Sequence, residues 1–152
     1  MGFGLPAAIG AKVASPDRQV CLFVGDGGLQ MTIQELGTIM QEGTAVKIVV
    51  LNNNWLGNVR QWQQLFWKSR YSFTRLLNPD FKAITEAYGI KYLKVCDRDH
   101  LTEAVQQMID EPGPCLLEAC VLEEGMVFPM IAPGKSVDDI MVTKDKLFVY
   151  GE

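Results

Sequence analysis

Two clusters of small and polar residues directly follow two apolar runs of the sequence. Gly25-Asp26-Gly27-Gly28 follows the run 19–24, and Asn52-Asn53-Asn54 follows the run 46–51. Glycines let the backbone approach a ligand closely, and the free N–H groups of a following helix suit a phosphate. The Asp26 carboxylate and an asparagine oxygen suit Mg²⁺, which takes oxygen ligands and shares its other positions with water and phosphates. Together the clusters predict a diphosphate held through magnesium.

Alternating strands and helices are expected to position these clusters. Apolar periodicity predicts buried strands over 19–24, 46–51, 90–95 and 115–121, and helices over 5–14, 30–42, 79–88 and 99–110. Asn78 is the expected N-cap of the third helix, with Pro79 in its first turn. This alternation predicts an α/β fold with three layers, α/β/α, and a mainly parallel sheet, in which ligands bind beyond the carboxyl ends of the strands.

The chain has no internal repeat, low-complexity segment or linker that would divide it. Residues 1–124 are therefore predicted to form one domain that binds the ligand. The apolar stretch after Glu124 has no regular pattern and contains two prolines, so residues 125–152 are predicted to form an irregular C-terminal arm of the same domain. An apolar arm must pack against this domain or a partner.

Composition and charge exclude several classes of partner. The chain has 152 residues with a formal net charge of -4, which gives no general attraction for nucleic acid or anionic lipid. No apolar run approaches the roughly 20 residues that span a bilayer, and no secretory signal is recognisable. We therefore expect a cytoplasmic protein with no membrane and no nucleic-acid partner.

The cysteines and the single histidine favour no metal site. None of the cysteines forms a C-x-x-C pair, and most lie in apolar runs, which favours buried free thiols over a disulfide or a zinc site. They are Cys21, Cys96, Cys115 and Cys120. His100 is the only histidine and is predicted to be a surface residue at a helix start, so a Ser-His-Asp triad has no candidate here.

Each polar cluster alone has a simpler explanation, because Gly, Asp and Asn dominate tight turns for backbone reasons. Other phosphate motifs fit poorly. A Rossmann glycine motif starting at Gly25 would need glycine where Gln30 stands, and a P-loop ending at Ser136 would need glycine where Pro129 stands.

The two clusters in this order and at this separation resemble the cofactor motif of thiamine diphosphate enzymes. Further motifs are similar to the C-terminal thiamine diphosphate-binding domain of the acetolactate synthase (acetohydroxyacid synthase) catalytic large subunit, and the likeness covers nearly the whole chain. The motifs are Met1–Gly10, Gln34-Glu35-Leu36, Leu51-Asn52-Asn53, Gln61-Trp62, Leu77–Phe81 and Phe128–Ile131.

The resemblance implies a ligand set for magnesium and a cradle for the diphosphate. The metal would be held by the side chains of Asp26 and Asn53 and by the backbone carbonyl of Trp55. Backbone groups of three glycines would contact the diphosphate, namely Gly27, Gly28 and Gly57.

The resemblance also implies contacts with the cofactor rings and the substrate. Met1 would lie against the rings, and Trp62 would line the site that selects the second 2-keto acid. No residue of this chain is implied as a catalytic general base. Without the resemblance, Trp62 would be interpreted as core packing, because Val59, Trp62 and Phe66 form a helical stripe.

The implied activity is that of a thiamine diphosphate-dependent transferase, which condenses pyruvate with pyruvate or 2-oxobutanoate in branched-chain amino acid biosynthesis. The family uses separate pyrimidine-binding and FAD domains, which these residues do not resemble, and the likeness begins inside a motif at Met1. We therefore expect a fragment that is inactive alone. The parent is expected to be a homo-oligomer with a possible regulatory small subunit.

Two alternatives stay open at the level of sequence. One is another thiamine diphosphate-dependent decarboxylase, oxidase or carboligase, and a second is a non-catalytic doubly wound module that binds a nucleotide. Residues 55–75 also mix aromatic and basic side chains, a composition seen in single-strand nucleic-acid grooves. The acidic surroundings favour a loop over a small anionic substrate instead.

Overall fold

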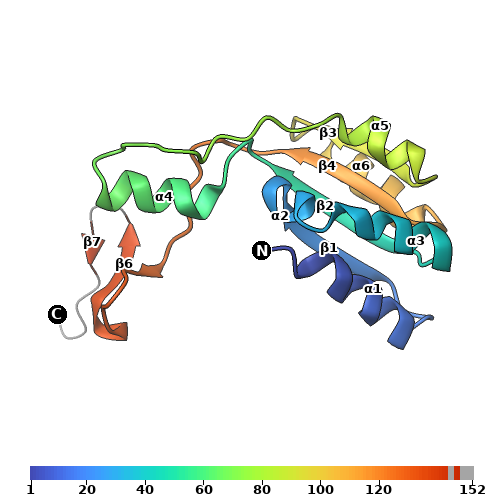
Figure 1. Ribbon diagram of the computed structural model, residues 1–152, viewed down its shortest axis with the longest axis horizontal. Helices are drawn as coiled ribbons and strands as arrows, with labels where there is room; N and C mark the ends of the chain where they lie inside the picture. Colours follow the sequence, from blue (N-terminus) through green and yellow to red (C-terminus); the bar gives the residue numbers. More distant parts are fainter. Residues whose placement is uncertain (144–145, 148–152) are drawn as a thin grey trace. The chain divides into compact units, whose positions relative to one another are not determined.

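Four parallel strands form the sheet of the first structural unit in the computed structural model, which describes residues 1–143 and 146–147 (Figure 1). The strand order is β1-β2-β4-β3. The strands are β1 (Val20–Gly25), β2 (Val46–Asn52), β3 (Lys91–Val95) and β4 (Cys115–Cys120). Each lies within two residues of a predicted strand. Parallel pairing places all four carboxyl ends at one edge of the sheet.

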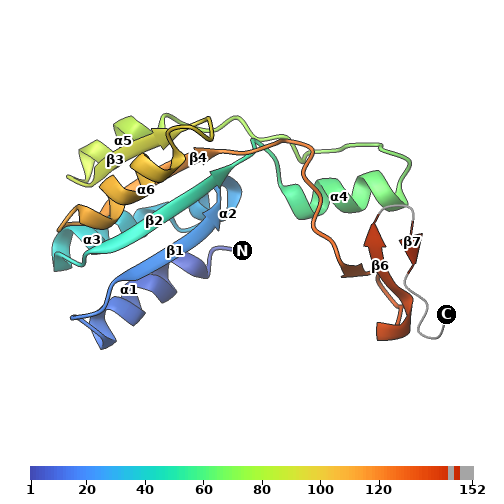
Figure 2. The same ribbon diagram turned by 180° about the vertical axis from the view of Figure 1, so that it is seen from behind.

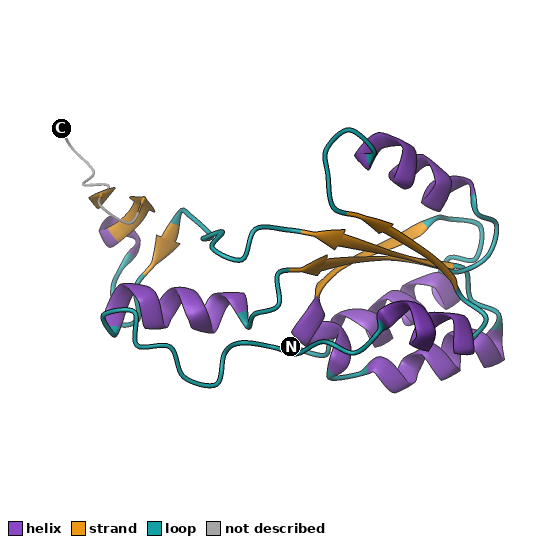
Figure 3. Ribbon diagram, turned by 90° about the horizontal axis from the view of Figure 1, so that it is seen from above, coloured by secondary structure: helices purple, strands orange, loops and turns teal. Residues whose placement is uncertain are grey.

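Helices cover both faces of this sheet, as predicted for a three-layer α/β/α fold (Figure 3). One apolar core joins the sheet to α1 (Gly4–Ala14), α2 (Asp26–Gln30), α3 (Leu36–Glu42) and α5 (Phe81–Ala87). A second core joins Val49 and Leu117 to Met108 of α6 (Leu101–Asp110), which packs on β3 and β4 (Figure 2). Helices on both sides bury the central strands, so these strands are almost continuously apolar.

The helix predicted over 30–42 is interrupted in the structure. The helix α2 ends at Gln30, and a short 3-10 helix, η1 (Ile33–Glu35), leads into α3. The break falls at Thr32, which has a φ of -136° and whose hydroxyl donates to the Gly2 carbonyl over 3.0 Å. The contact with Gly2 comes from a segment distant in sequence, so local periodicity did not predict it. The cap expected at Gly43 is confirmed, with a φ of 61°.

The N-cap of α5 is Asp80 and not Asn78. The Asp80 side chain accepts a hydrogen bond from the Ala83 backbone N–H at 3.1 Å. Pro79 precedes this cap instead of opening the helix. One helix end needs one side-chain cap, so the Asn78 amide is available for other partners.

The second unit combines residues 56–74 with the described residues from 124 onward. It contains α4 (Gly57–Phe66), η2 (Val137–Asp139) and an antiparallel sheet of β5 (Met130–Ile131), β6 (Ile140–Thr143) and β7 (Lys146–Leu147). The prediction of an irregular arm is therefore wrong for these strands, which are too short to give a sequence signal. Residues 144–145 and 148–152 of the predicted arm lie outside the described residues.

The cysteines also differ from the prediction of buried free thiols. Cys96 and Cys120 form a disulfide with a Cα–Cα distance of 4.6 Å, Cys21 is exposed, and only Cys115 is a buried free thiol. The cause is strand order: Cys96 follows β3 and Cys120 ends β4, and these strands are hydrogen-bonded neighbours. Their separation in sequence gave no sign of this.

Among the described residues, none of the helices has the length and apolar character needed to cross a bilayer. His100 is exposed at the start of α6, as predicted.

Candidate functional site

Asp26 lies at the carboxyl end of β1 and is the first residue of α2. The register pairs Gly25 with Leu51, so Asp26 follows one strand tip while Asn52 ends the neighbouring one. Asp26 is only 1% exposed. A buried carboxylate requires hydrogen-bond donors or a cation as partners.

The asparagines after β2 turn the chain with their own side chains. Asn52 Oδ1 accepts from the Asn54 N–H at 3.1 Å, and Asn53 Oδ1 accepts from the Trp55 N–H at 3.0 Å. Asn54 has a φ of 58°, which asparagine tolerates better than most residues. The turn explanation of this cluster is therefore correct, and it also fixes the directions of two amide groups.

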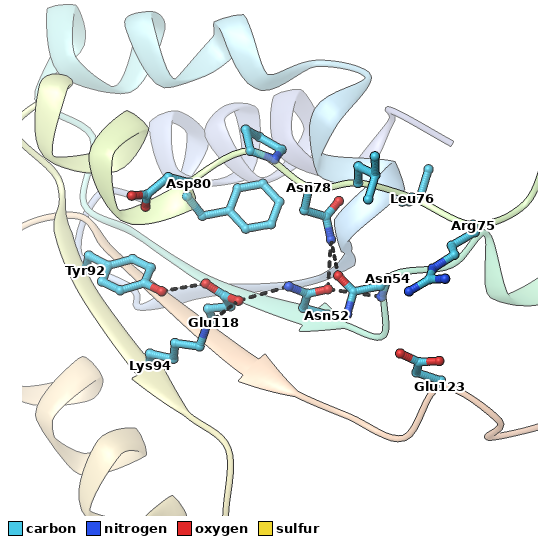
Figure 4. Close-up of a pocket in the computed structure, with 13 residues that line it drawn as sticks. Asn52, Asn54, Arg75, Leu76, Asn78, Asp80, Tyr92, Lys94, Glu118 and Glu123 are labelled. Carbon is cyan, nitrogen blue, oxygen red and sulfur yellow. Dashed lines mark hydrogen bonds and ion pairs between the residues drawn. The ribbon is translucent and has the colours of Figure 1, made fainter.

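Asn78 links the two strand tips. Its Nδ2 donates to Asp26 Oδ2 at 2.7 Å, to Asn52 Oδ1 at 2.9 Å and to Asn54 Oδ1 at 3.2 Å. Gln30 Nε2 in turn donates to Asn78 Oδ1 at 2.7 Å. Figure 4 shows the Asn78 amide directed at Asn52 and Asn54. Through Asn78 the structure joins Asp26 to Asn52 and Asn54.

A second buried carboxylate extends these contacts along the sheet edge. Glu118 of β4 is 4% exposed and accepts from Asn52 Nδ2 at 2.9 Å, from Lys94 Nζ at 3.1 Å and from the Tyr92 hydroxyl (Figure 4). We call Asp26, Asn52, Asn54, Asn78 and Glu118 the strand-tip network.

Burial and hydrogen bonds shift the pKa values of Glu118 and Tyr92. Burial acts to raise the pKa of Glu118, but the hydrogen bonds from Tyr92, Asn52 and Lys94 outweigh it, so this pKa is lowered from its usual value. Burial and the bond to Glu118 raise the pKa of Tyr92. At neutral pH Glu118 is therefore ionised and its partner Tyr92 is protonated.

The segment that contains Asn78 is fixed on both sides. Before it, the Leu76 N–H donates to the Asn54 carbonyl at 2.8 Å, and Arg75 forms a β-bridge with Trp55. After it, Phe81 is 3% exposed in the core. The segment borders a cavity of about 510 Å³, which Arg75, Lys94, Glu118 and Glu123 also line. Its lining combines apolar side chains with charged side chains of both signs.

Gly27 and Gly28 occupy the start of α2. The N-cap of this helix is Gly25, which provides no side-chain hydrogen bond, so the first N–H groups of the helix are not capped by it. A Cβ on Gly28 would lie 3.2 Å from Val24 Cγ2, so this position is tightly packed against β1. Gly27 directly follows Asp26 in the chain, and Gly28 comes after it.

Gly57 and Trp62 belong to α4 in the second unit. Trp62 is 43% exposed there, and Val59 and Phe66 are also exposed. The buried residues of α4 are instead Arg60 and Gln61. The core-packing interpretation of Trp62 is therefore not supported within this unit. Met1, at the chain start, is 73% exposed.

Gln61 anchors the segment after residue 124 to α4. Its Oε1 accepts from the Val127 N–H at 2.7 Å, and its Nε2 donates to the Val127 carbonyl at 3.0 Å. This two-way pairing explains why a glutamine is buried in this helix.

Sequence reasoning missed Asn78, Gln30 and Glu118 as members of the site. Two signals were present. Asn78 and Asp80 are both good caps for one helix, which left one of them unassigned, and Glu118 is the single charge in the apolar run 115–121. A charged residue in a buried strand needs partners.

The available donor atoms fit a hard divalent cation. Among residues 1–143 and 146–147, no group of three or more His, Cys, Asp or Glu side chains could hold a metal ion by itself. One buried carboxylate, amide oxygens and backbone carbonyls suit Mg²⁺, which completes its shell with water and phosphate oxygens. They do not suit zinc, which prefers His and Cys ligands.

The first unit has a parallel α/β sheet, with an acid and asparagines at adjacent strand tips. This arrangement is typical of the class of α/β domains that bind a ligand at the carboxyl edge of the sheet. Residues 1–119 match the family described as thiamine pyrophosphate enzyme, C-terminal TPP binding domain, and the chain belongs to this family.

Individual relatives with high identity to this chain are acetolactate synthases. The chain is 51% identical over 138 residues to the acetolactate synthase large subunit of Pyropia yezoensis, covering 90% of this chain and 23% of that protein. It is 45% identical over 141 residues to the mitochondrial acetolactate synthase catalytic subunit of Saccharomyces cerevisiae, covering 93% and 20%. For the acetolactate synthase isozyme 2 large subunit of Escherichia coli K12, the identity is 44% over 142 residues, covering 93% and 26%. The chain thus spans about a quarter of the length of these relatives.

Proposed function

We propose that these residues are the part of an acetolactate synthase catalytic subunit that binds magnesium and the cofactor diphosphate. The reaction is the condensation of pyruvate with pyruvate or 2-oxobutanoate to 2-acetohydroxy acids. The observation that supports it best is the position of Asp26, a nearly inaccessible carboxylate at the tip of β1, beside the asparagines that follow β2. Family membership supplies the cofactor class.

The proposed metal ligands are the side chains of Asp26 and Asn53 and the backbone carbonyl of Trp55. Supporting this set, Asp26 and Asn53 follow neighbouring strands, and the Asn53 side chain is already oriented by the Trp55 N–H. A single carboxylate leaves the site able to accept an anionic diphosphate together with the cation.

The proposed diphosphate contacts are backbone groups of Gly27, Gly28 and Gly57. The uncapped start of α2 supports the first two, because N–H groups at a helix start favour anions. Met1 is proposed to lie against the cofactor rings. Trp62 is proposed to select the second 2-keto acid, and its exposure within the second unit leaves it accessible for that contact.

When bound, the cofactor supplies the nucleophilic carbon that attacks 2-keto acids. The contribution of this chain would be to bind and orient: Asp26 and Asn53 would hold the cation, and backbone groups of the glycines would bind the diphosphate. No residue of this chain is proposed as a general base.

The larger assembly is proposed to include a pyrimidine-binding domain, an FAD domain and a possible regulatory small subunit, in a cytoplasmic homo-oligomer. These proposals rest on the similarity to acetolactate synthase large subunits. An assay for acetolactate in the complete subunit separates this activity from that of another thiamine diphosphate-dependent decarboxylase, oxidase or carboligase.

The direct test is calorimetric titration of the purified 152-residue chain with thiamine diphosphate, with and without Mg²⁺. We expect saturable binding that requires the metal. Asp26→Ala should abolish this binding, while Asp17→Ala, an exposed turn residue, should leave it unchanged. Binding that is indifferent to metal, or equal in Asp26→Ala, would reject the proposal in favour of a non-catalytic module.

A further inference from the structure

We propose that Asn78 is a positioning residue for the magnesium site, acting through the Asp26 carboxylate. This inference rests on the proposed function and assigns a role to a residue outside the proposed ligand set. It starts from the bond between Asn78 Nδ2 and Asp26 Oδ2 at 2.7 Å, the shortest of the three bonds that Asn78 Nδ2 donates.

The orientation of the Asn78 amide is determined by its partners on both sides. Nδ2 faces three oxygen acceptors, on Asp26, Asn52 and Asn54, and an ionised carboxylate can only accept. Oδ1 faces the Nε2 donor of Gln30. Only one orientation of the amide therefore places its nitrogen at the three acceptors and its oxygen at the donor.

An uncharged donor such as the Asn78 amide is suited to bind the Asp26 carboxylate. Asn78 binds Oδ2 and so fixes the plane of the Asp26 carboxylate, while Oδ1 is the oxygen that Asn78 does not engage. Because an amide has no net charge, the carboxylate keeps its full negative charge for a cation. A lysine or arginine in the same place would compete with the metal electrostatically.

The residues on either side of Asn78 hold it in place. The bond from the Leu76 N–H to the Asn54 carbonyl and the buried Phe81 fix the segment on either side of it. The following Pro79 also restricts Asn78 to extended conformations. The Asn78 side chain is thus held in place between the tips of β1 and β2. Groups that orient a metal ligand typically change metal affinity about 10- to 100-fold when they are removed.

The test uses the 152-residue chain and Mn²⁺ as the probe, with free Mn²⁺ measured by electron paramagnetic resonance. Asn78→Leu keeps the approximate volume and removes the donor. We expect its Mn²⁺ affinity to fall about tenfold or more. Gln30→Ala, which removes the bond that orients the Asn78 amide, should weaken Mn²⁺ binding in the same direction but less.

The matched control is Asp80→Ala, in the same segment. It removes the α5 cap and lowers the melting temperature, but Asp80 does not bond to Asp26, so Mn²⁺ affinity should stay the same. A purely structural role for Asn78 would lower the melting temperature in both variants and change Mn²⁺ affinity in neither.

The outcomes separate the two proposals. If the unmodified chain binds no Mn²⁺, the proposed function fails and this inference fails with it. If the unmodified chain binds and folded Asn78→Leu binds equally well, only the role of Asn78 is rejected. Should Asn78→Leu not fold, Gln30→Ala decides, and an unchanged affinity in that variant overturns the inference.

Discussion

Asn52 Nδ2 donates to Glu118 Oε1 over 2.9 Å, which ties the end of β2 to a buried carboxylate on β4. The same asparagine accepts from Asn78 through its Oδ1. Its amide is thereby oriented from both ends, and polar groups at the tips of β1 and β2 form one connected network with Glu118 within β4.

Replacing Glu118 by Gln should destabilise the first unit by about 2 kcal/mol, because charge-assisted hydrogen bonds from Lys94, Tyr92 and Asn52 are lost or weakened in a buried place. Urea unfolding measures this change. The control Glu86→Gln affects an exposed pair with Lys82 and should cost at most about 0.5 kcal/mol. Equal effects of both substitutions would contradict the assignment of Glu118 to a buried network.

The same carboxylate predicts a pH dependence of stability. The pKa of folded Glu118 is lowered from 4.5, so its contribution is fully present above that value and is lost as the pH falls through the lower, folded pKa. The difference in unfolding free energy between the unmodified chain and Glu118→Gln should therefore shrink in acid. Urea titrations at neutral pH and at about pH 3 compare the two. A constant difference would show that Glu118 is not the titrating group.

The reactivity of the cysteines should follow their burial and pairing in the structure, and not the expectation of buried free thiols. In the native chain, Cys21 should react with Ellman's reagent, whereas Cys115 should not, because burial raises the pKa of its thiol to about 11 and blocks access. Unfolding should expose Cys115, and only a reductant should release Cys96 and Cys120. Four reactive thiols in the unfolded, unreduced chain would exclude the disulfide.

Trp62→Leu should change the stability of the chain by less than about 0.5 kcal/mol, since the side chain is 43% exposed and lies outside the buried face of α4. In the complete catalytic subunit it should reduce the preference for the larger 2-keto acid. The product ratio measures this preference, and Trp67→Leu on the same segment is the control. An unchanged ratio in Trp62→Leu would remove Trp62 from substrate selection.

Gln61→Ala should lower the free energy of local opening of the segment around Val127 by about 2 kcal/mol, because both backbone groups of Val127 lose their partner. Hydrogen exchange of the Val127 amide should accelerate, while exchange in β2 stays the same. Asn58→Ala, at an exposed position of α4, provides the comparison. Unaltered protection of Val127 would mean that other contacts hold this segment.

Local sequence patterns determined the order of the elements and which polar clusters follow neighbouring strands. Apolar runs such as 46–51 and the cap at Gly43 depend on near neighbours in the chain, so they could be recognised without coordinates. The parallel sheet then required Asp26 and the asparagines after β2 to lie at one edge, because parallel strands end on the same side.

Only the tertiary structure decided which side chains meet. The order β1-β2-β4-β3 brings Glu118 beside Asn52, and Cys96 beside Cys120, and local periodicity contains no information on that order. Asn78 shows the same limit: its sequence context allowed a helix cap, but Asp80 took that role and the fold placed the amide against Asp26. Hydrogen bonds between residues far apart in sequence depend on packing, and packing is a property of the folded chain as a whole.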